Sequence, residues 1–255
     1  MKYKIFIINL DRSVERYQHA LEQLAPWPDL PIERVSAADG RQMSEAELNQ
    51  YYSFSLNQQY YHKILKPGEK GCYISHIWCW QEIVAQQLDF ALILEDDFVV
   101  KSNLSALLSE ISQLTEKWHY IKLAMPNKAQ PVMRCQPLGG GFSLVHYKKH
   151  PVSTVAQFVS LAGANLLLEK AVPFYRPVDV MLQYHFDLGI KALGISPQPF
   201  CPEHSFDSSI YTLDKADKNQ RLFLMNRVSY FFQSQLFNLK TYGLKSLLTA
   251  RKLTE

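Results

Sequence analysis

The 255-residue chain contains no apolar run long enough to cross a membrane. A membrane-spanning helix needs about 20 consecutive apolar residues, and polar or charged residues interrupt every apolar stretch here well before that length. The stretch at residues 5–8 is also too short for the core of a signal peptide, and Asp11 and Arg12 follow it closely. We therefore expect neither a membrane-spanning segment nor a cleaved leader.

Cysteine is scarce, and glycine and proline form no linker. The four cysteines, at 72, 79, 135 and 201, are too few and too scattered for a disulfide framework, which favours a reducing compartment. The ten glycines and thirteen prolines are dispersed, and no internal repeat is visible. With 47% apolar and 20% charged residues, the chain has the composition of a globular protein, in one large α/β domain or a domain with an appendage.

The positive charge is concentrated at the carboxyl end. Residues 218–255 contain seven basic side chains and one acidic one, a balance of +6, so the net charge of +3 leaves −3 for the remainder. Apolar and aromatic residues recur there at helical spacing, with a break near Gly243. We predict a domain over residues 1–215 and a basic amphipathic helical tail over 216–255. The tail either lies on an anionic membrane surface or packs on the domain or a second copy; no motif indicates nucleic-acid binding.

Apolar periodicity predicts an α/β fold with a mostly parallel central sheet. A near-continuous apolar run at 4–10, a helical stripe at 14–24 that Ser13 can cap, and a second strand at 32–36 form a β-α-β unit. A wide apolar helix begins at residue 67, and strands are expected at 90–94, 118–123 and 155–161, with a short strand broken by prolines at 195–201. Residues 44–66 read as short helices and loops, and 125–153 as a long loop or a hairpin around three glycines.

The strongest chemical signal is Glu95-Asp96-Asp97, which follows the apolar strand at 90–94. Alternation along an extended chain predicts that Glu95 and Asp97 point to one side and Asp96 to the other. Two carboxylates on one side repel each other unless a cation or a proton lies between them. Mg²⁺ and Mn²⁺ accept such ligands, and α/β sheets bind ligands beyond the carboxyl ends of their strands. The alternative is a solvated turn that caps the next helix.

Other candidate residues follow the first strand and open the buried helix. Asn9, Leu10 and Arg12 stand where such a sheet receives a nucleotide, and Arg16 follows Arg12 by one helical turn. His76 shares a helix face with Cys72 and Cys79, but this spacing lacks a fourth ligand and is not a usual zinc pattern.

Two acids and one histidine in the second half complete the candidates. Asp179 stands among apolar neighbours, which suits a general base, and Asp187 is a second candidate for that role. His204 follows the last core strand and would add an imidazole ligand to a metal site. The alternative for each acid is a helix cap, and for the histidine a structural position.

Five ordered motifs together resemble glycosyltransferase family 25, the lipopolysaccharide and lipooligosaccharide sugar transferases. They are IFIINLDRSVER, VSAADG, PGEKGCYISH, LILEDD and RPVDV, spread over roughly residues 3–205. The resemblance implies a GT-A-like nucleotide-binding fold, a UDP-sugar donor, a Mn²⁺-type ion (or Mg²⁺), and a lipooligosaccharide or oligosaccharide acceptor. It also implies, for many relatives, inversion at the transferred sugar.

The resemblance assigns roles to individual residues. Its metal-binding acidic motif falls on Glu95, Asp96 and Asp97, and its nucleotide-site motifs fall on the residues Asn9, Leu10, Arg12, Asp39, Ser75 and His76. The family motif carries Lys70 here, where relatives commonly have a smaller or apolar residue.

The resulting hypothesis is a metal-dependent transferase that moves a hexose, galactose by preference, from UDP to a lipooligosaccharide. It places Glu95, Asp97 and His204 on the metal and Asp179 or Asp187 as the base, on the cytoplasmic side of the inner membrane. The alternatives are a metal-dependent phosphohydrolase and a non-catalytic module that binds sugar nucleotides or glycans.

Overall fold

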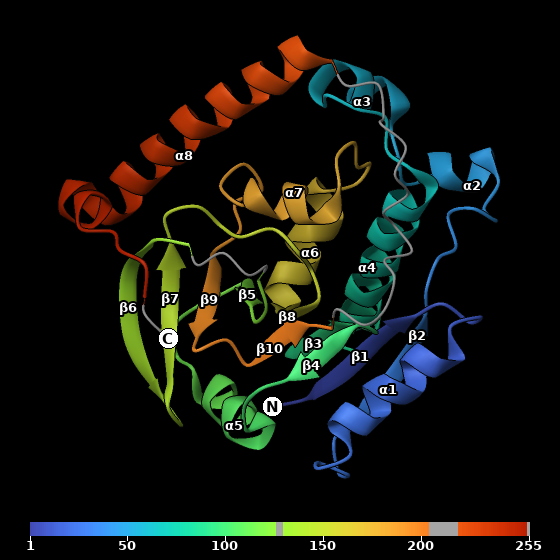
Figure 1. Ribbon diagram of the computed structural model, residues 1–255, viewed down its shortest axis with the longest axis vertical. Helices are drawn as coiled ribbons and strands as arrows, with labels where there is room; N and C mark the ends of the chain where they lie inside the picture. The colour runs from blue at the N-terminus through green and yellow to red at the C-terminus, as the bar shows by residue number, and fades with distance from the viewer. Residues whose placement is uncertain (126–129, 204–218, 254–255) are drawn as a thin grey trace.

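The computed structural model describes residues 1–125, 130–203 and 219–253 (Figure 1). Its centre is an eight-stranded sheet in the order β2-β1-β3-β8-β5-β9-β7-β6. The strands are β1 (Tyr3–Asn9), β2 (Ile32–Ser36), β3 (Phe90–Glu95), β5 (Tyr120–Lys122), β6 (Val132–Gly139), β7 (Phe142–Tyr147), β8 (Ala156–Ser160) and β9 (Ala192–Ser196). A second, two-stranded sheet pairs β4 (Phe98–Val100) with β10 (Phe200–Pro202).

The strand directions confirm a mostly parallel sheet. The pairs β1–β2, β1–β3 and β5–β9 are parallel. The pairs β3–β8, β5–β8, β6–β7 and β7–β9 are antiparallel. When these directions are followed across the sheet, only β7 and β8 of its eight strands run against the others. The expected β-α-β opening is therefore present, and β1, β2 and β3 end at the same edge.

Helices cover both faces of the sheet, as Figure 1 shows. One face carries α4 (Pro67–Ala85), α6 (Leu161–Lys170) and α7 (Val178–Gln183), and the other carries α1 (Val14–Leu24) and α5 (Leu104–Gln113). Alternate residues of β1 serve the two cores: Phe6 and Ile8 pack with α4, whereas Ile5 and Ile7 pack with α1 and α5. Burial on both faces explains why the strand reads as a continuous apolar run.

Short polar signals set the helix boundaries. Pro67 opens α4, and the Glu69 carboxylate accepts from the Lys66 backbone amide at 2.9 Å. Asn103 and Ser160 cap α5 and α6 through their side chains. Ser13 precedes α1 but its side chain makes no capping hydrogen bond, so that predicted contact is wrong. The region 44–66 folds into α2 (Glu45–Asn49), α3 (Phe54–Tyr60) and loops, as expected.

The structure settles the arrangement of two later segments that the sequence left open. Residues 125–153 contain the β6–β7 hairpin, whose turn has Gly139, Gly140 and Gly141 at positive φ. The proline break expected in the strand over 195–201 is present, and it separates β9 from β10. The two strands belong to different sheets, which the sequence pattern does not specify. Pro197 and Pro199 lie between them, and proline supplies no amide hydrogen to a ladder.

The tail forms α8 (Gln220–Leu248), which spans the top of Figure 1. It runs from the loop after α3, where the Asn219 amide donates to the His62 carbonyl, to β6, where Val132 and Arg251 pair. Gly243, with φ of 77°, interrupts the helix where a break was predicted. None of the helices in the described residues has the length and apolar composition to span a bilayer.

Candidate functional site

A cavity of about 100 Å³ lies beyond the carboxyl ends of β1, β2 and β3. We call it the strand-end cavity. Its charged lining residues are Arg12, Arg16, Asp39, Arg41, Glu95, Asp96 and Asp97. Leu10, Cys72, Ser75 and His76 also line it. The structure thus brings together the predicted acidic cluster, the end of the first strand, the turn after the second and the start of α4, as expected for an α/β sheet.

Close backbone contact between α4 and the turn at residues 37–40 shapes one wall of this cavity. A Cβ on Gly71 would lie 2.3 Å from the Ala38 carbonyl oxygen, and a Cβ on Gly40 would lie 2.0 Å from that of Pro67. The buried Ser75 hydroxyl accepts from the Ala38 amide at 2.9 Å and donates to the Gly71 carbonyl at 2.8 Å. Ser75 therefore fixes the wall that carries Asp39.

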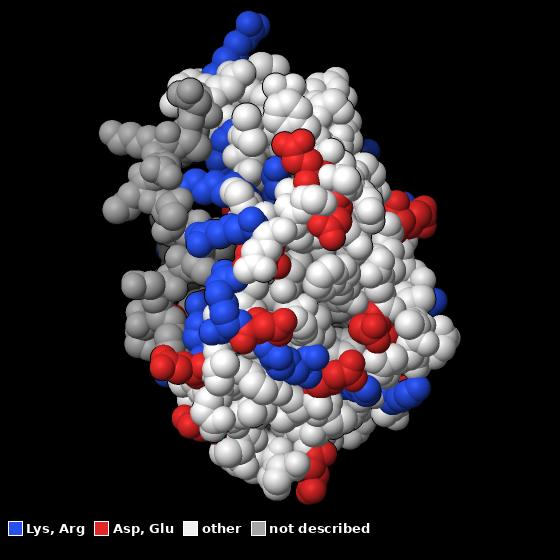
Figure 2. Space-filling model, turned by 90° about the vertical axis from the view of Figure 1, so that its right-hand side faces the viewer, with Lys and Arg blue, Asp and Glu red and all other residues white. Residues whose placement is uncertain are grey.

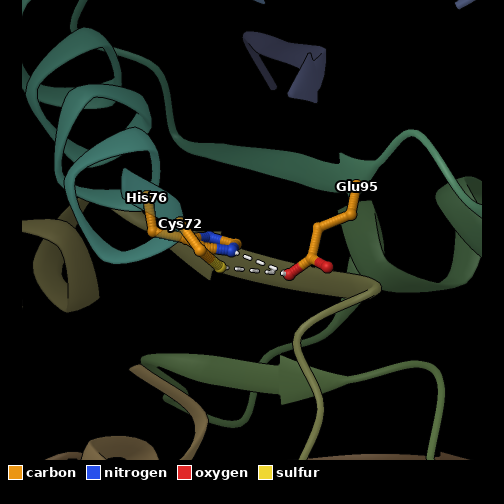
Figure 3. Close-up of side chains that lie close together, drawn as sticks. All are labelled: Cys72, His76 and Glu95. Carbon is orange, nitrogen blue, oxygen red and sulfur yellow. Dashed lines mark hydrogen bonds and ion pairs between the residues drawn. The ribbon is translucent and has the colours of Figure 1, made fainter. Parts of the chain in front are cut away.

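Glu95 is held by a buried hydrogen-bonded cluster, which Figure 3 shows. Its Oε1 lies 3.1 Å from His76 Nε2, 2.5 Å from Thr154 Oγ1 and 4.0 Å from Cys72 Sγ. Gln157 donates to His76 Nδ1 at 2.9 Å, which assigns the imidazole proton to Nε2. Burial opposes ionisation of Glu95, but the bonds from His76 and Thr154 leave its pKa below the usual value.

The same cluster contains two of the three residues that were considered as zinc ligands on α4, Cys72 and His76. Ligand atoms of Cys72, His76 and Glu95 lie within 4.8 Å of one another. Burial and the neighbouring acids raise the pKa of the Cys72 thiol well above its usual value, so it stays protonated and donates to Glu95. Cys79 packs in the apolar core on the α4 face. Cys72, His76 and Glu95 are thus hydrogen-bonded to one another, which holds the Glu95 carboxylate in place, and their ligand atoms are close enough together for a metal ion.

Asp96 and Asp97 both turn toward Arg16. The Arg16 guanidinium forms an ion pair with Asp96 and lies 3.2 Å from Asp97 Oδ2. Asn9 Nδ2 donates to Asp96 at 2.6 Å, so Asn9 supports an acid of the lining from behind. The prediction that Asp96 points away from Asp97 is wrong, because β3 ends at Glu95 and the chain bends there, which removes the strand alternation.

Asp97 is the least satisfied acid of the cavity. Burial, followed by the charge of Glu95, raises its pKa to about 7, and Arg16 only partly offsets this. Its Oδ1 is buried without a hydrogen-bond partner among the described residues. An unpaired carboxylate oxygen beside two further carboxylates fits a hard divalent cation, which takes oxygen ligands of this kind. Asp97 and Glu95 have the donor chemistry to hold such an ion.

Cations and acids alternate around the mouth of the cavity. Arg12 forms an ion pair with Asp39, and Arg34 lies 2.8 Å from Asp11. Figure 2 shows basic and acidic side chains in close alternation across the middle of one face of the molecule. Guanidinium groups so placed can bind phosphate oxygens.

A buried lysine lies behind the cavity. Lys122, at the end of β5, is 1% exposed and donates to the Ser153 carbonyl. Burial lowers its pKa to about 8, although Asp179 and Glu95 both act in the opposite direction. Asp179, in the first turn of α7, accepts from the Ser153 amide at 3.2 Å. Lys122 thus interacts electrostatically with both the predicted base and the acidic cluster. A lysine within an apolar strand is rare, and that rarity was the available signal in the sequence.

The remaining predicted residues lie apart. Asp187 is exposed in the turn after α7, and neither it nor Asp179 lines the strand-end cavity. Asp179 is favoured because it raises the pKa of Cys72, which does line that cavity. His204 lies outside the described residues. The sequence reading did not single out Thr154 or Gln157, which hold Glu95 and His76; polar residues within an apolar strand segment were the available signal.

Comparison with known proteins settles the family. The model of "Glycosyltransferase family 25 (LPS biosynthesis protein)" matches residues 2–182. The chain belongs to glycosyltransferase family 25. This family 25 chain is 28% identical over 239 residues to a "Glycosyltransferase 25 family member" of Drosophila pseudoobscura pseudoobscura, covering 85% of this chain and 37% of that protein.

Two mammalian relatives differ in their described activity. Human "Procollagen galactosyltransferase 2" is 26% identical over 223 residues, covering 79% of this chain and 35% of that protein. A rat "Probable inactive glycosyltransferase 25 family member 3" is 31% identical over 195 residues, covering 72% and 33%. The family 25 chain therefore spans about a third of the length of these curated relatives, and family membership alone does not decide whether it is active.

Proposed function

We propose that this chain is a glycosyltransferase that moves a hexose, by preference galactose, from UDP to a saccharide acceptor. The observation that carries the proposal is the strand-end cavity, where three carboxylates and an unpaired Asp97 oxygen face Arg12 and Arg16 at the carboxyl ends of β1, β2 and β3. Membership of family 25 supports sugar transfer as the reaction.

In this proposal Asp97 and Glu95 hold a Mn²⁺ or Mg²⁺ ion, and Arg12 binds the diphosphate. When bound, the ion offsets the charge that develops on the UDP leaving group. His76 and Thr154 keep Glu95 ionised and oriented. Asp39 and Leu10 line the same cavity and are proposed to contact the nucleotide.

Asp179 is the proposed general base. Its carboxylate is fixed by the Ser153 and Val180 amides and lies close enough to Lys122 and Cys72 to affect their pKa values. It would accept the proton of the acceptor hydroxyl as that oxygen attacks the sugar in an inverting displacement. Asp187 is the second candidate.

We further propose a lipooligosaccharide or lipopolysaccharide acceptor and a peripheral position on the cytoplasmic face of the inner membrane. The description of the family as a lipopolysaccharide biosynthesis protein supports the acceptor class. The outward face of α8 supports the position: Leu224, Val228, Phe232 and Leu236 are between 52% and 66% exposed, although apolar. Such a face next to basic residues fits an anionic bilayer surface.

The decisive experiment incubates the purified chain with UDP-galactose or UDP-glucose and Mn²⁺, with and without de-O-acylated lipooligosaccharide. Release of UDP that requires the acceptor, together with an acceptor heavier by one hexose, supports transfer. Release of inorganic phosphate without acceptor identifies a phosphohydrolase instead. Binding of UDP without turnover of either sugar nucleotide identifies a non-catalytic module.

A further inference from the structure

A second cavity, of about 460 Å³, lies between α8 and the body of the molecule. We call it the helix cavity. The loop after α3, α7 and residues 148–149 form its walls on the body side, and α8 closes it from the other side. Figure 1 shows α7 facing α8 across this region. Its volume is in the range of about 300–1,000 Å³ that is typical of small-molecule sites.

The lining of the helix cavity has charge of one sign. Lys148, Lys149, Arg176 and Arg227 line it, and none of its lining residues in the described part of the chain is acidic. None of the four takes part in an ion pair within the described chain. Buried Arg176 Nε lacks a hydrogen-bond partner among the same residues. Arg176 partly offsets the rise that burial causes in the pKa of Asp187, an acid outside this lining. The cations of the lining itself still attract an anion.

Aromatic rings accompany these cations. The Arg176 guanidinium lies 3.9 Å from the centroid of the Tyr184 ring, and Lys149 Nζ lies 5.5 Å from that of Tyr230. Tyr61 and Phe223 line the same space. Rings of this kind offer flat, weakly polar surfaces with hydroxyl groups at their edges, which suit a saccharide whose one face is apolar and whose rim hydrogen-bonds.

The helix cavity is linked to the proposed base by α7. Arg176, Val180 and Gln183 line the cavity, and Asp179 belongs to the same short segment. Asp179 and Glu69 both raise the pKa of Tyr61, a residue of the cavity wall, although burial is the larger cause. Asp179 also raises the pKa of Cys72, which lines the strand-end cavity. Asp179 therefore interacts electrostatically with both cavities.

We infer that the helix cavity binds an acidic saccharide, one that carries a phosphate or carboxylate group, as the acceptor. This inference rests on the proposed function, since it makes Asp179 the group between donor and acceptor. Arg176 and Lys149 bind the anion, and the rings of Tyr184 and Tyr230 contact the sugar. The acidic group thereby becomes a determinant of acceptor specificity.

The test is a calorimetric titration of glucose 6-phosphate into the protein saturated with UDP and Mn²⁺. We expect glucose 6-phosphate to bind at least about tenfold more tightly than glucose or inorganic phosphate, because ring contacts and charge-assisted bonds act together. Arg176→Gln should weaken it at least about tenfold. The double variant Lys149→Gln/Arg227→Gln, at exposed positions, should do the same if Arg176→Gln fails to fold.

A control variant keeps the outcomes distinct. Arg221→Gln removes a charge from α8 outside the cavity and should not change glucose 6-phosphate binding. Equal binding of glucose and glucose 6-phosphate would overturn the inference. So would Arg176-dependent binding of phosphatidylglycerol vesicles without binding of the sugar phosphate, since that identifies a lipid headgroup site. Failure of UDP to bind in the first step refutes the proposed function separately.

Discussion

At the residue scale, the three consecutive acids at positions 95–97 of the strand-end cavity are held in different ways. Glu95 is bonded by His76 and Thr154, and Asp96 by Arg16 and Asn9, whereas one oxygen of Asp97 has no partner in the described chain. A carboxylate that is buried near like charges and left partly unpaired binds a proton more tightly than it would in water. Asp97 is therefore the group at which a proton would compete with the proposed metal ion.

The pH dependence of stability tests this description of Asp97. Its pKa is about 7 in the folded protein against 3.8 ordinarily, so the folded state binds the proton more tightly and loses stability as pH rises from about 4 to 7. Asp97→Asn should remove that cost and raise the free energy of unfolding on the order of 2 kcal/mol above pH 7. Denaturant unfolding at pH 5 and pH 8 measures it.

Asp29→Asn, in an exposed turn, is the matched control and should leave the difference between the two pH values unchanged. The description of Asp97 fails if its variant changes stability equally at pH 5 and pH 8.

At the element scale, the cavity depends on how closely α4 approaches the turn after β2. Gly71 and Gly40 permit this approach, and the hydrogen bond from the Ala38 amide to the Ser75 hydroxyl stabilises it. Neither glycine has a positive φ, so backbone conformation does not require glycine at these positions. Glycine is needed there because a Cβ atom would collide with neighbouring backbone atoms. The approach brings Asp39 opposite Arg12.

Gly71→Ala should therefore damage the nucleotide site. The added Cβ would lie 2.3 Å from the Ala38 carbonyl oxygen and 2.7 Å from the Gly40 amide nitrogen, both of them backbone atoms, so α4 must move. We expect a loss of unfolding free energy on the order of 2 kcal/mol and at least about tenfold weaker UDP binding, measured by thermal unfolding and calorimetry. Gln81→Ala, at an exposed position of α4, should change neither quantity, and a Gly71→Ala protein with unaltered UDP affinity would contradict the argument.

The elements themselves were largely predictable from the sequence. Runs such as residues 4–10 and 32–36 carry a strong local pattern, and Pro67 and Gly243 mark a helix start and a helix break. The errors arose where tertiary structure overrides local pattern. Residues 195–201 divide between two sheets, and the bend after Glu95 turns Asp96 toward Arg16. Lys122 contacts Ser153, Thr154 contacts Glu95 and Gln157 contacts His76. Each contact joins segments that are distant in sequence, which no spacing rule specifies.

At the scale of the whole molecule, the two sides of α8 differ in composition and in exposure. Its inner side is polar or aromatic: Asn238 donates to the Lys148 carbonyl, Tyr242 contacts His146, and Tyr230 packs on Tyr184. Its outer side is apolar and exposed. Of the two readings of the tail, packing on the domain is thus observed, and the arrangement leaves the apolar side free for the proposed membrane surface.

Binding to lipid vesicles tests that surface. Phe232→Ser/Leu236→Ser removes two apolar side chains that are 66% and 52% exposed and do not line the helix cavity. We expect cosedimentation with phosphatidylglycerol vesicles to fall at least about tenfold, because each apolar group buried in a bilayer interface contributes to binding. Phe54→Ser/Ile64→Ser, at 46% and 54% exposure away from α8, should bind as the wild type does. Equal loss in both double variants would exclude α8 as the membrane-binding face.

The central claim is that a divalent cation on Asp97 and Glu95 binds the diphosphate of a UDP-sugar. The most direct test is calorimetric titration of UDP into the wild-type chain and Asp97→Asn, each with Mn²⁺ and with EDTA in its place. We predict that UDP binds the wild type with Mn²⁺, and that either EDTA or Asp97→Asn weakens binding at least about a hundredfold. UDP affinity that is the same with EDTA, or the same in a folded Asp97→Asn protein, would contradict the claim.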